Sequence, residues 1–426
     1  MLSRLENIKI PFVKSNEIKF LLFFGLIYRL AIFSVYTTVT KWPDSWGFMV
    51  LSEYLLNFDL SGYNGERSPG YALLIFLGFG TMRITIIYQF IIGIITSVYW
   101  YKIALNLKFN KNNALWITLF IETFLHVFFY ETSILIESFA LFFFAVIFYH
   151  LSDDYFQKNS LKLEIWMSFL FGFLVLIKPF FAYIPFIIYG FSVLYNFNLK
   201  KIINQKIIIL LFPLVAYFGW SYVNKVNTGY FVSTTYLGLN IAQNCVCFAE
   251  KGPEEYQLII DSYVKYREKV ISENKDVAMT IWHSHENELK YKYPYFPDCS
   301  HELGKYGKAT IKNNLGDYFY QVITKSWFDF WKVQIYWHYD QFNFKYINYL
   351  FGGIWKIQKV ILYFIKFTFL FLVPFYIFQF FKRRKITIEL VMVVVVFAGS
   401  VLQGLVTFGT NVKYSFPYEF LMIFTV

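Results

Sequence analysis

The sequence predicts an all-α polytopic membrane protein: a bundle of about ten transmembrane helices with a mainly helical domain outside the cytoplasm. Of its 426 residues, 57% are hydrophobic and only 16% are charged, whereas soluble domains carry about 25% charged residues. Apolar runs close to the ~20 residues that span a bilayer recur along the chain. The net charge of +11 falls mostly in short loops between these runs, which indicates membrane topology rather than nucleic-acid binding.

The apolar runs set the order of the elements. Nine runs are candidate spans: residues 20–39, 84–105, 115–130, 133–151, 166–178, 181–197, 207–223, 355–381 and 386–408. A tenth run starts at Phe416 and covers half a membrane before Val426, so either the chain is a fragment or this last helix is short. Arg29 falls within the first span, where it either snorkels or pairs internally.

Basic residues in the short loops predict the orientation. They fall on one side of the membrane if the N-terminus is cytoplasmic. They precede the first span and follow the second, fourth, sixth and eighth: Arg4, Lys9, Lys14, Lys19, Lys108, Lys111, Lys158, Lys162, Lys200, Lys201, Lys206 and the run 382–385. The first loop, Lys178 and the segment 224–350 then face outward.

Three regions follow from this topology. They are an N-terminal transmembrane module, 1–223, whose first outer loop is 40–82; an extracytoplasmic domain, 224–350, between spans seven and eight; and C-terminal transmembrane helices, 351–426. In the outer domain, Pro253 and two glutamates mark a helix start. A second amphipathic run, 311–331, interleaves aromatic residues with lysines. This run either lies at the lipid headgroups or packs on its own domain.

All three cysteines, Cys245, Cys247 and Cys299, fall in the outer domain. An oxidising compartment would favour a disulfide between Cys299 and one of the other two, with free thiols as the alternative. The nearby histidines match no common zinc spacing, so zinc is the less favoured interpretation. Four outer tryptophans would either stack on sugar rings or anchor the domain at the interface: Trp282, Trp327, Trp331 and Trp337.

The first outer loop concentrates charge beside the bilayer, where charge is costly and usually functional. Asp44 opens an amphipathic stretch, and one interpretation is that it only caps that helix. Glu66 and Arg67 are pinned by a Ser-Pro-Gly turn. Arginine suits bidentate phosphate binding, and the neighbouring carboxylate would hold it in place or bind a divalent cation. A surface ion pair, worth little, is the alternative.

Further polar residues are expected at membrane depth. Glu131 and Glu137 flank the turn between the third and fourth spans, and Lys178 ends the fifth. Glu122 and His126 are one helical turn apart, and this spacing favours a hydrogen bond between them over a metal site. Acids and cations gathered at one face of the bilayer suit a reaction on an anionic lipid headgroup.

Three motifs follow one another along the chain. An Asp-Ser-Trp-Gly-Phe run from Asp44 precedes the turn Arg67-Ser68-Pro69-Gly70-Tyr71. Trp-x-x-x-Asn, Thr-Gly-x-Phe-like and Ser-Thr elements follow in order from Trp220 to Thr234, and Lys413-Tyr414-Ser415-Phe416-Pro417 comes last. In this order the motifs resemble the GT-C superfamily of membrane glycosyltransferases, specifically the bacterial enzymes similar to protein O-mannosyltransferases and the aminoarabinose transferase of lipid A.

The resemblance implies an enzyme of the bacterial inner membrane, with a GT-C-like bundle and an active site that faces the exterior. It would transfer a sugar, with inversion, from a polyprenyl-phosphate donor to a lipid, glycan or protein acceptor, and Asp44 would be the general base. The implied site residues are Asp44, Glu66 and Glu137 for catalysis; Arg67, Lys178, Lys413 and Tyr414 for the donor phosphate; Tyr71, Asn224 and Asn240 for substrate; and Asp44 with Glu66 for a divalent metal cation.

Two other classes remain open. A polysaccharide polymerase or ligase also acts on lipid-linked glycans, but its catalytic cluster is expected in a large late loop, whereas the acids here fall in the first. A lipid-sugar transporter or flippase would place charges near the midplane and show paired broken helices or internal repeats. The sequence shows no such pairing, and transport leaves the outer domain unexplained.

Overall fold

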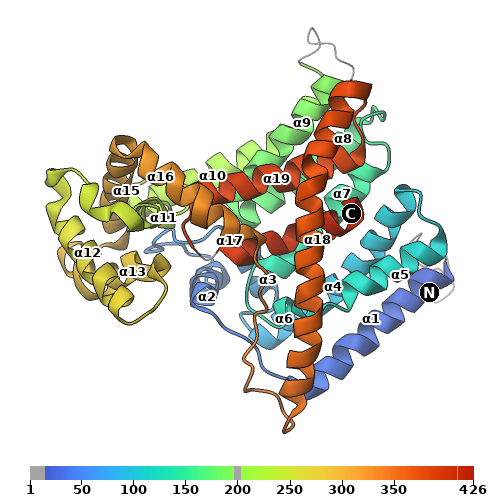
Figure 1. Cartoon of the computed structure of the whole chain (residues 1–426), viewed down its shortest axis with the longest axis horizontal. Helices are drawn as coiled ribbons and strands as arrows, with labels where there is room; N and C mark the ends of the chain where they lie inside the picture. The colour runs from blue at the N-terminus through green and yellow to red at the C-terminus, as the bar shows by residue number, and fades with distance from the viewer. Residues whose placement is uncertain (1–14, 196–202, 410) are drawn as a thin grey trace.

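The computed structural model describes residues 15–195, 203–409 and 411–426. Within these ranges the chain is helical, and the only β-type pairing is an isolated bridge between Thr40 and Ser133. The prediction of an all-α fold is therefore confirmed. Four helices of the predicted outer domain gather at the left of Figure 1: α12 (Gln257–Ser272), α13 (Thr280–Ser284), α15 (Phe296–Asn313) and α16 (Leu315–Gln321). They lie away from α1 (Asn16–Val35), α4 (Met82–Asn106) and α5 (Lys111–Glu122) at the right.

Five helical segments of the described chain are long and apolar enough to cross a membrane. They are α1 (Asn16–Val35), α4 (Met82–Asn106), the segment Gln205–Thr228, which joins η4 (Gln205–Leu210) to α10 (Leu211–Thr228), α18 (Ile347–Arg383) and α19 (Ile388–Val406). A sixth is counted if α5 (Lys111–Glu122) and α6 (Leu125–Glu131), bent by 59°, form one span. The chain is thus consistent with an integral membrane protein.

The other predicted spans form shorter helices, because polar residues or proline interrupt them. These helices are α7 (Glu137–Ser152), α8 (Leu161–Ile177), η2 (Pro179–Ala182) with α9 (Tyr183–Tyr195), and α20 (Glu419–Thr425). Whether they also cross, to make about ten spans, stays a prediction. Of the residues used for orientation, Arg4, Lys9, Lys14, Lys200 and Lys201 lie outside the described residues, as do the last two residues of the predicted span 181–197.

The break between α5 and α6 is sealed by a side chain from another helix. The amide of Gln358 on α18 donates to the carbonyl of Thr123 (2.8 Å) and accepts from the backbone N–H of Leu125 (2.8 Å). Backbone groups at membrane depth must find partners inside the protein. Gln358 supplies both at this break, so the bend is a built feature of the bundle.

The first outer loop folds into two short helices, α2 (Pro43–Leu56) and α3 (Pro69–Leu77). The outer domain consists of many short elements: α11 (Tyr236–Gln243), η5 (Val246–Lys251), η6 (Glu254–Tyr256), α12 (Gln257–Ser272), η7 (Val277–Met279), α13 (Thr280–Ser284), η8 (His285–Leu289), α14 (Lys290–Lys292), α15 (Phe296–Asn313), α16 (Leu315–Gln321), η9 (Val322–Ser326) and α17 (Trp327–Trp331). As predicted, helices begin just after Pro253.

Most of the predicted outer domain, 224–350, packs around a second buried cluster, to which Phe408 also contributes. Cys245 and Cys299 are buried in it with Leu239, Tyr263 and Tyr306. All three cysteines are free thiols, so the expected disulfide is wrong. Cys245 and Cys299 instead behave as small apolar core residues, as buried free cysteines commonly do.

Of the two alternatives left open for the run 311–331, the structure shows packing against the protein. One face, which includes Tyr318, Val322 and Phe330, is buried against the protein. The opposite face leaves Phe319 and Ile323 exposed. α17 and η9 also contact the candidate span α19, and contact of the exposed face with lipid headgroups stays a prediction.

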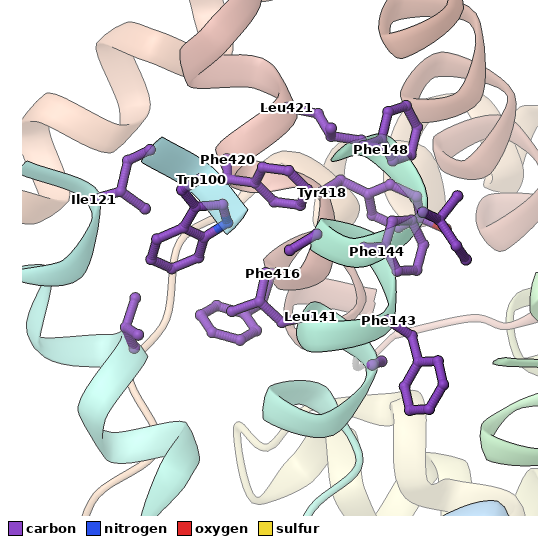
Figure 2. Close-up of a cluster of buried hydrophobic side chains, with 14 of the residues drawn as sticks. Trp100, Ile121, Leu141, Phe143, Phe144, Phe148, Phe416, Tyr418, Phe420 and Leu421 are labelled. Carbon is purple, nitrogen blue, oxygen red and sulfur yellow. The ribbon is translucent and has the colours of Figure 1, made fainter. Parts of the chain in front are cut away.

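The C-terminal segment, η10 (Asn411–Tyr418) and α20, lies inside the bundle. Figure 2 shows Phe416, Tyr418 and Phe420 between side chains of α4 and α7. The ring of Tyr418 meets Phe144 at 4.9 Å between centroids, and Phe420 meets Trp100 at 6.0 Å. This packing fixes the start of η10, where Lys413 is found.

Buried ion pairs tie the bundle together in a pattern that the sequence did not predict. Arg29 pairs with both Glu122 (2.8 Å) and Glu131 (2.7 Å), so it pairs internally rather than snorkelling. His126 contacts Glu419 on α20 at 2.5 Å, and Glu419 also pairs with Lys366 (2.8 Å). The predicted Glu122–His126 hydrogen bond is wrong, because α5 ends between the two residues and each side chain finds a distant partner.

Candidate functional site

The position of Asp44 depends on a contact between two distant loops. The backbone N–H of Thr40 donates to the carbonyl of Thr132 (2.9 Å), and the N–H of Ile134 donates to the carbonyl of Thr40 (3.0 Å). These bonds hold the start of the first outer loop against the turn before α7. Asp44, at the start of α2, and Glu137, at the start of α7, therefore line the same cavity.

Asp44 does not cap its helix. The helix-start hydrogen bond comes from Ser45, whose hydroxyl accepts from the backbone N–H of Trp42 (2.9 Å). The Asp44 carboxylate instead pairs with two cations: one oxygen with Arg67 Nη2 at 2.8 Å, the other with Lys413 Nζ. The capping interpretation is thus replaced by an ion-pair cluster that joins the first loop to η10.

The guanidinium group of Arg67 packs between two aromatic rings beside α2. Its guanidinium carbon lies 5.0 Å from the ring centre of Phe48 and 4.5 Å from that of Tyr236, which is cation–π distance. A Cβ atom at Gly47 would come within 2.7 Å of Arg67 Nε. A glycine at position 47 therefore leaves room for the guanidinium to reach Asp44, three residues earlier on the same helix.

The Ser-Pro-Gly turn docks against the end of α8. Ser68 donates to the carbonyl of Ile177 (3.2 Å), and a Cβ at Gly70 would lie 2.4 Å from the backbone nitrogen of Ile177. Only glycine permits that approach. The turn thereby brings Arg67 to the cavity that Lys178 also lines, where Lys178 Nζ lies 3.1 Å from the ring centre of Tyr414.

The two other predicted acids are held differently. Glu66 accepts a hydrogen bond from the hydroxyl of Tyr236 (2.9 Å), and its backbone carbonyl accepts one from Thr234. Glu66 is thus anchored to the outer domain. Glu137 is buried, and one of its carboxylate oxygens has no hydrogen-bond partner within the described part of the chain. A buried polar atom without a partner is unusual and calls for an explanation.

Two adjoining cavities meet at the Asp44 cluster. The first, here called the charged cavity, has about 620 Å³ of empty space and is lined by Asp44, Glu66, Arg67, Glu137, Lys178 and Lys413, with Tyr414 and Asn240. The second, here called the aromatic cavity, has about 1090 Å³ and is lined by Trp42, Tyr236, Trp282, Tyr336 and Tyr414, with Asn240, Gln243, Met279 and Thr407. Asp44, Arg67 and Lys413 line both.

The local charges keep this cluster ionised. Burial alone would raise the pKa of Asp44, but the positive charges of Lys413 and Arg67 outweigh it and hold the pKa well below its usual range. Burial would lower the pKa of Arg67 and of Lys413, and in both cases the Asp44 carboxylate reverses the shift. At neutral pH the cluster is thus one carboxylate between two cations.

The predicted substrate residues separate into two groups. Asn240 lines both cavities. Tyr71 is fully buried and donates to Gln89 (2.9 Å), away from both. Asn224 is also buried, and its amide donates to the carbonyl of Val232 (2.8 Å). Tyr71 and Asn224 support the packing around the site instead of contacting a ligand.

Several site residues were missed by sequence reasoning. They are Gly47, Tyr236, Tyr336 and Trp42. Gly47 carried a usable signal, since it is a glycine within a helical stretch, three residues after Asp44. Tyr236 and Tyr336 carried none, because aromatic residues make up 23% of this chain.

The residues present do not fit a divalent cation at Asp44 and Glu66. Both Asp44 oxygens pair with cations, and Glu66 accepts from Tyr236. In the part of the chain that the structure describes, no three acidic, histidine or cysteine side chains form a metal-binding group.

Comparisons with protein-family models, with curated proteins and with solved structures gave no match to this chain.

Proposed function

We propose that the chain is an integral membrane glycosyltransferase that moves a sugar from a polyprenyl-phosphate donor to an acceptor hydroxyl. The observation that carries this proposal is the Asp44–Arg67–Lys413 cluster at the junction of two cavities. It offers one carboxylate able to accept a proton and two cations able to hold phosphate, within reach of one small ligand. The reaction would occur on the extracytoplasmic side of a bacterial inner membrane, with the N-terminus in the cytoplasm.

The charged cavity suits the donor phosphate. It is lined by three basic side chains, Arg67, Lys178 and Lys413, and arginine and lysine side chains are the usual protein partners of phosphate. Lys178 makes no ion pair within 4 Å in the described ranges, and its ammonium rests on the Tyr414 ring. It is therefore available to bind an incoming anion without breaking an existing pair.

Donor binding would also activate the base. As the cluster stands, Asp44 is a weak base because its pKa is held low by Arg67 and Lys413. A phosphate that shares these two cations would reduce their hold on the carboxylate and raise its proton affinity. We therefore expect the donor to bind before Asp44 can act on the acceptor.

The proposed transfer is a single in-line displacement. The acceptor hydroxyl gives its proton to the Asp44 carboxylate, and its oxygen forms a bond to the anomeric carbon of the sugar. The bond from that carbon to the phosphate oxygen breaks, and its electron pair leaves with the phosphate, which Arg67 and Lys413 stabilise. The products are a glycoside of inverted configuration and the polyprenyl phosphate.

A transfer assay tests the proposal. Full-length protein in detergent is supplied with radiolabelled polyprenyl-phosphate sugars and membrane extract as acceptor source. Wild-type protein should move label to an acceptor, and Asp44→Asn should remain folded while transfer falls by about 10²–10⁴-fold. Asp59→Asn, which removes an exposed carboxylate of the same loop, is the matched control and should leave transfer unchanged. Normal turnover by Asp44→Asn would remove Asp44 as the base.

A further inference from the structure

The aromatic cavity has a lining that phosphate chemistry does not use. Asp44, Arg67 and Lys413 are its only charged lining residues, and it shares them, together with Tyr236, Asn240 and Tyr414, with the charged cavity. Half of the ten uncharged lining residues are tryptophan or tyrosine, and three more carry an amide or a hydroxyl: Asn240, Gln243 and Thr407. The two cavities therefore differ in chemistry on either side of one ion-pair cluster.

The rings of this cavity are held in place by one another. Trp42 stacks on His338 (5.3 Å between ring centres) and meets Tyr336 edge-on (5.1 Å). Trp282 meets Tyr236 edge-on at 5.1 Å. Rings fixed in this way present flat apolar faces with little loss of conformational entropy on binding.

Polar groups remain free between the rings. Within the described part of the chain, the side-chain amide of Asn240 and the indole N–H of Trp282 make no hydrogen bond. Neither is among the buried polar atoms that lack a partner, so both remain accessible from the cavity. Both can therefore bond to a ligand in the cavity. Flat apolar faces alternating with uncharged donors and acceptors match a sugar ring, whose C–H faces are apolar and whose rim is hydroxyl groups.

We infer that the aromatic cavity binds a neutral carbohydrate, which serves as the acceptor of the proposed transferase. That the bound carbohydrate is the acceptor rests on the proposed function. That the cavity binds a carbohydrate rests only on the residues that line it. A phosphorylated, sulfated or carboxylated glycan would have to compete with the donor phosphate for the only cations of the lining, Arg67 and Lys413. Burying such an unpaired charge is unfavourable.

The location of the cavity separates acceptor from donor. Asn240, Met279 and Trp282 come from α11, η7 and α13 of the outer domain. Asn240 also lines the charged cavity, but only that cavity reaches Glu137 and Lys178, at the ends of the apolar helices α7 and α8. A donor on a lipid carrier arrives from the membrane helices, whereas a glycan arrives from the outer domain. The two would meet at Asp44.

Binding without donor tests the inference separately from catalysis. Full-length protein in detergent is titrated, by saturation-transfer NMR, with the neutral pentasaccharides of glucose, mannose and N-acetylglucosamine. A sialylated oligosaccharide and a serine- and threonine-rich peptide are the comparison ligands. Trp282→Ala should weaken binding of a neutral oligosaccharide about tenfold, since it removes a ring face. Trp282→Phe keeps an aromatic ring and should retain most of the wild-type affinity for the neutral oligosaccharide. Tyr291→Ala, an exposed ring on α14, should bind as wild type.

The outcomes are distinct. Neutral oligosaccharide binding that depends on a ring at position 282 supports the inference, even if no sugar transfer is ever observed. Transfer with a Trp282→Ala protein whose acceptor KM is unchanged would overturn the inference and leave the transferase standing. Absence of binding by any neutral probe, equal binding of the sialylated probe, or preference for the peptide would each overturn it as well.

Discussion

Two clusters of this protein share one design with opposite signs. In the membrane bundle, Arg29 is held by two carboxylates, Glu122 and Glu131. At the cavity junction, Asp44 is held by two cations, Arg67 and Lys413. The Arg29 side chain is 3% exposed and its partners at most 2%, whereas the Asp44 side chain is 35% exposed.

The difference in exposure separates a structural role from a chemical one. No ligand can reach Arg29, so its partners are permanent and their loss leaves buried charges unpaired. Asp44 and its cations line two cavities, so a phosphate can replace the carboxylate as their partner. The same charge pattern therefore stabilises the fold around Arg29, whereas around Asp44 a ligand can replace one of the paired groups.

Removing Arg29 should have the largest effect on stability. Arg29→Met leaves Glu122 and Glu131 facing each other without a cation, and the free energy of unfolding should fall by about 3–5 kcal/mol. Thermal unfolding in detergent, followed by circular dichroism, measures this loss. Arg83→Met, an exposed arginine on α4, is the matched control. An unchanged midpoint for Arg29→Met would mean that the cluster does not hold the bundle together.

Removing Lys413 should act on transfer more than on stability. Lys413→Met leaves Asp44 with Arg67 alone and deprives the leaving phosphate of one cation. The kcat of transfer should fall by about 10²–10³-fold, while the unfolding midpoint changes less than it does in Arg29→Met. Lys312→Met, at an exposed position on α15, should match wild type. If Lys413→Met lowered the unfolding midpoint as much as Arg29→Met does, both clusters would have a structural role. The contrast between a structural and a chemical cluster would then be wrong.

A smaller effect is expected from filling the space beside Arg67. In Gly47→Ala the new Cβ would displace the guanidinium, because it would lie 2.7 Å from Nε. We expect kcat/KM to fall roughly tenfold, since a displacement near 1 Å weakens positioning. Stability should not fall, since alanine is the better helix former. Gly219→Ala on α10, where the added Cβ meets nothing, should keep full activity.

The pH dependence of stability should show the smallest effect. The pKa of Asp44 is lowered in the folded chain, so its ion pairs stabilise the fold above the unfolded pKa of about 3.9. That contribution is lost as the pH falls toward the lowered value. The difference in unfolding midpoint between wild type and Asp44→Asn should therefore shrink from pH 7 to pH 3. A difference that grows on acidification would show that Asp44 is not held as a carboxylate.

Much of the candidate site was predictable because its residues lie in short, unusual motifs. Asp44, Arg67 and Lys413, from three segments far apart in the chain, meet within bonding distance as expected of one pocket. Tyr71 and Asn224 were assigned to substrate from their motifs, but they pack beneath the site. A motif predicts which segments lie near the site. A single sequence does not distinguish the side chain that lines a cavity from the side chain that packs behind it.

The sequence by itself determined the helical class, the apolar segments and the loop that carries the charges, because hydrophobicity and helix breakers act over a few residues. Only the tertiary structure decided which charge meets which. Glu122 bonds to Arg29, 93 residues away, instead of His126, four residues away. Such pairings depend on how helices pack, since a buried charge takes whichever opposite charge the packing brings within reach. The division into a charged and an aromatic cavity has the same origin, because the walls of the two cavities come from eight separate parts of the chain.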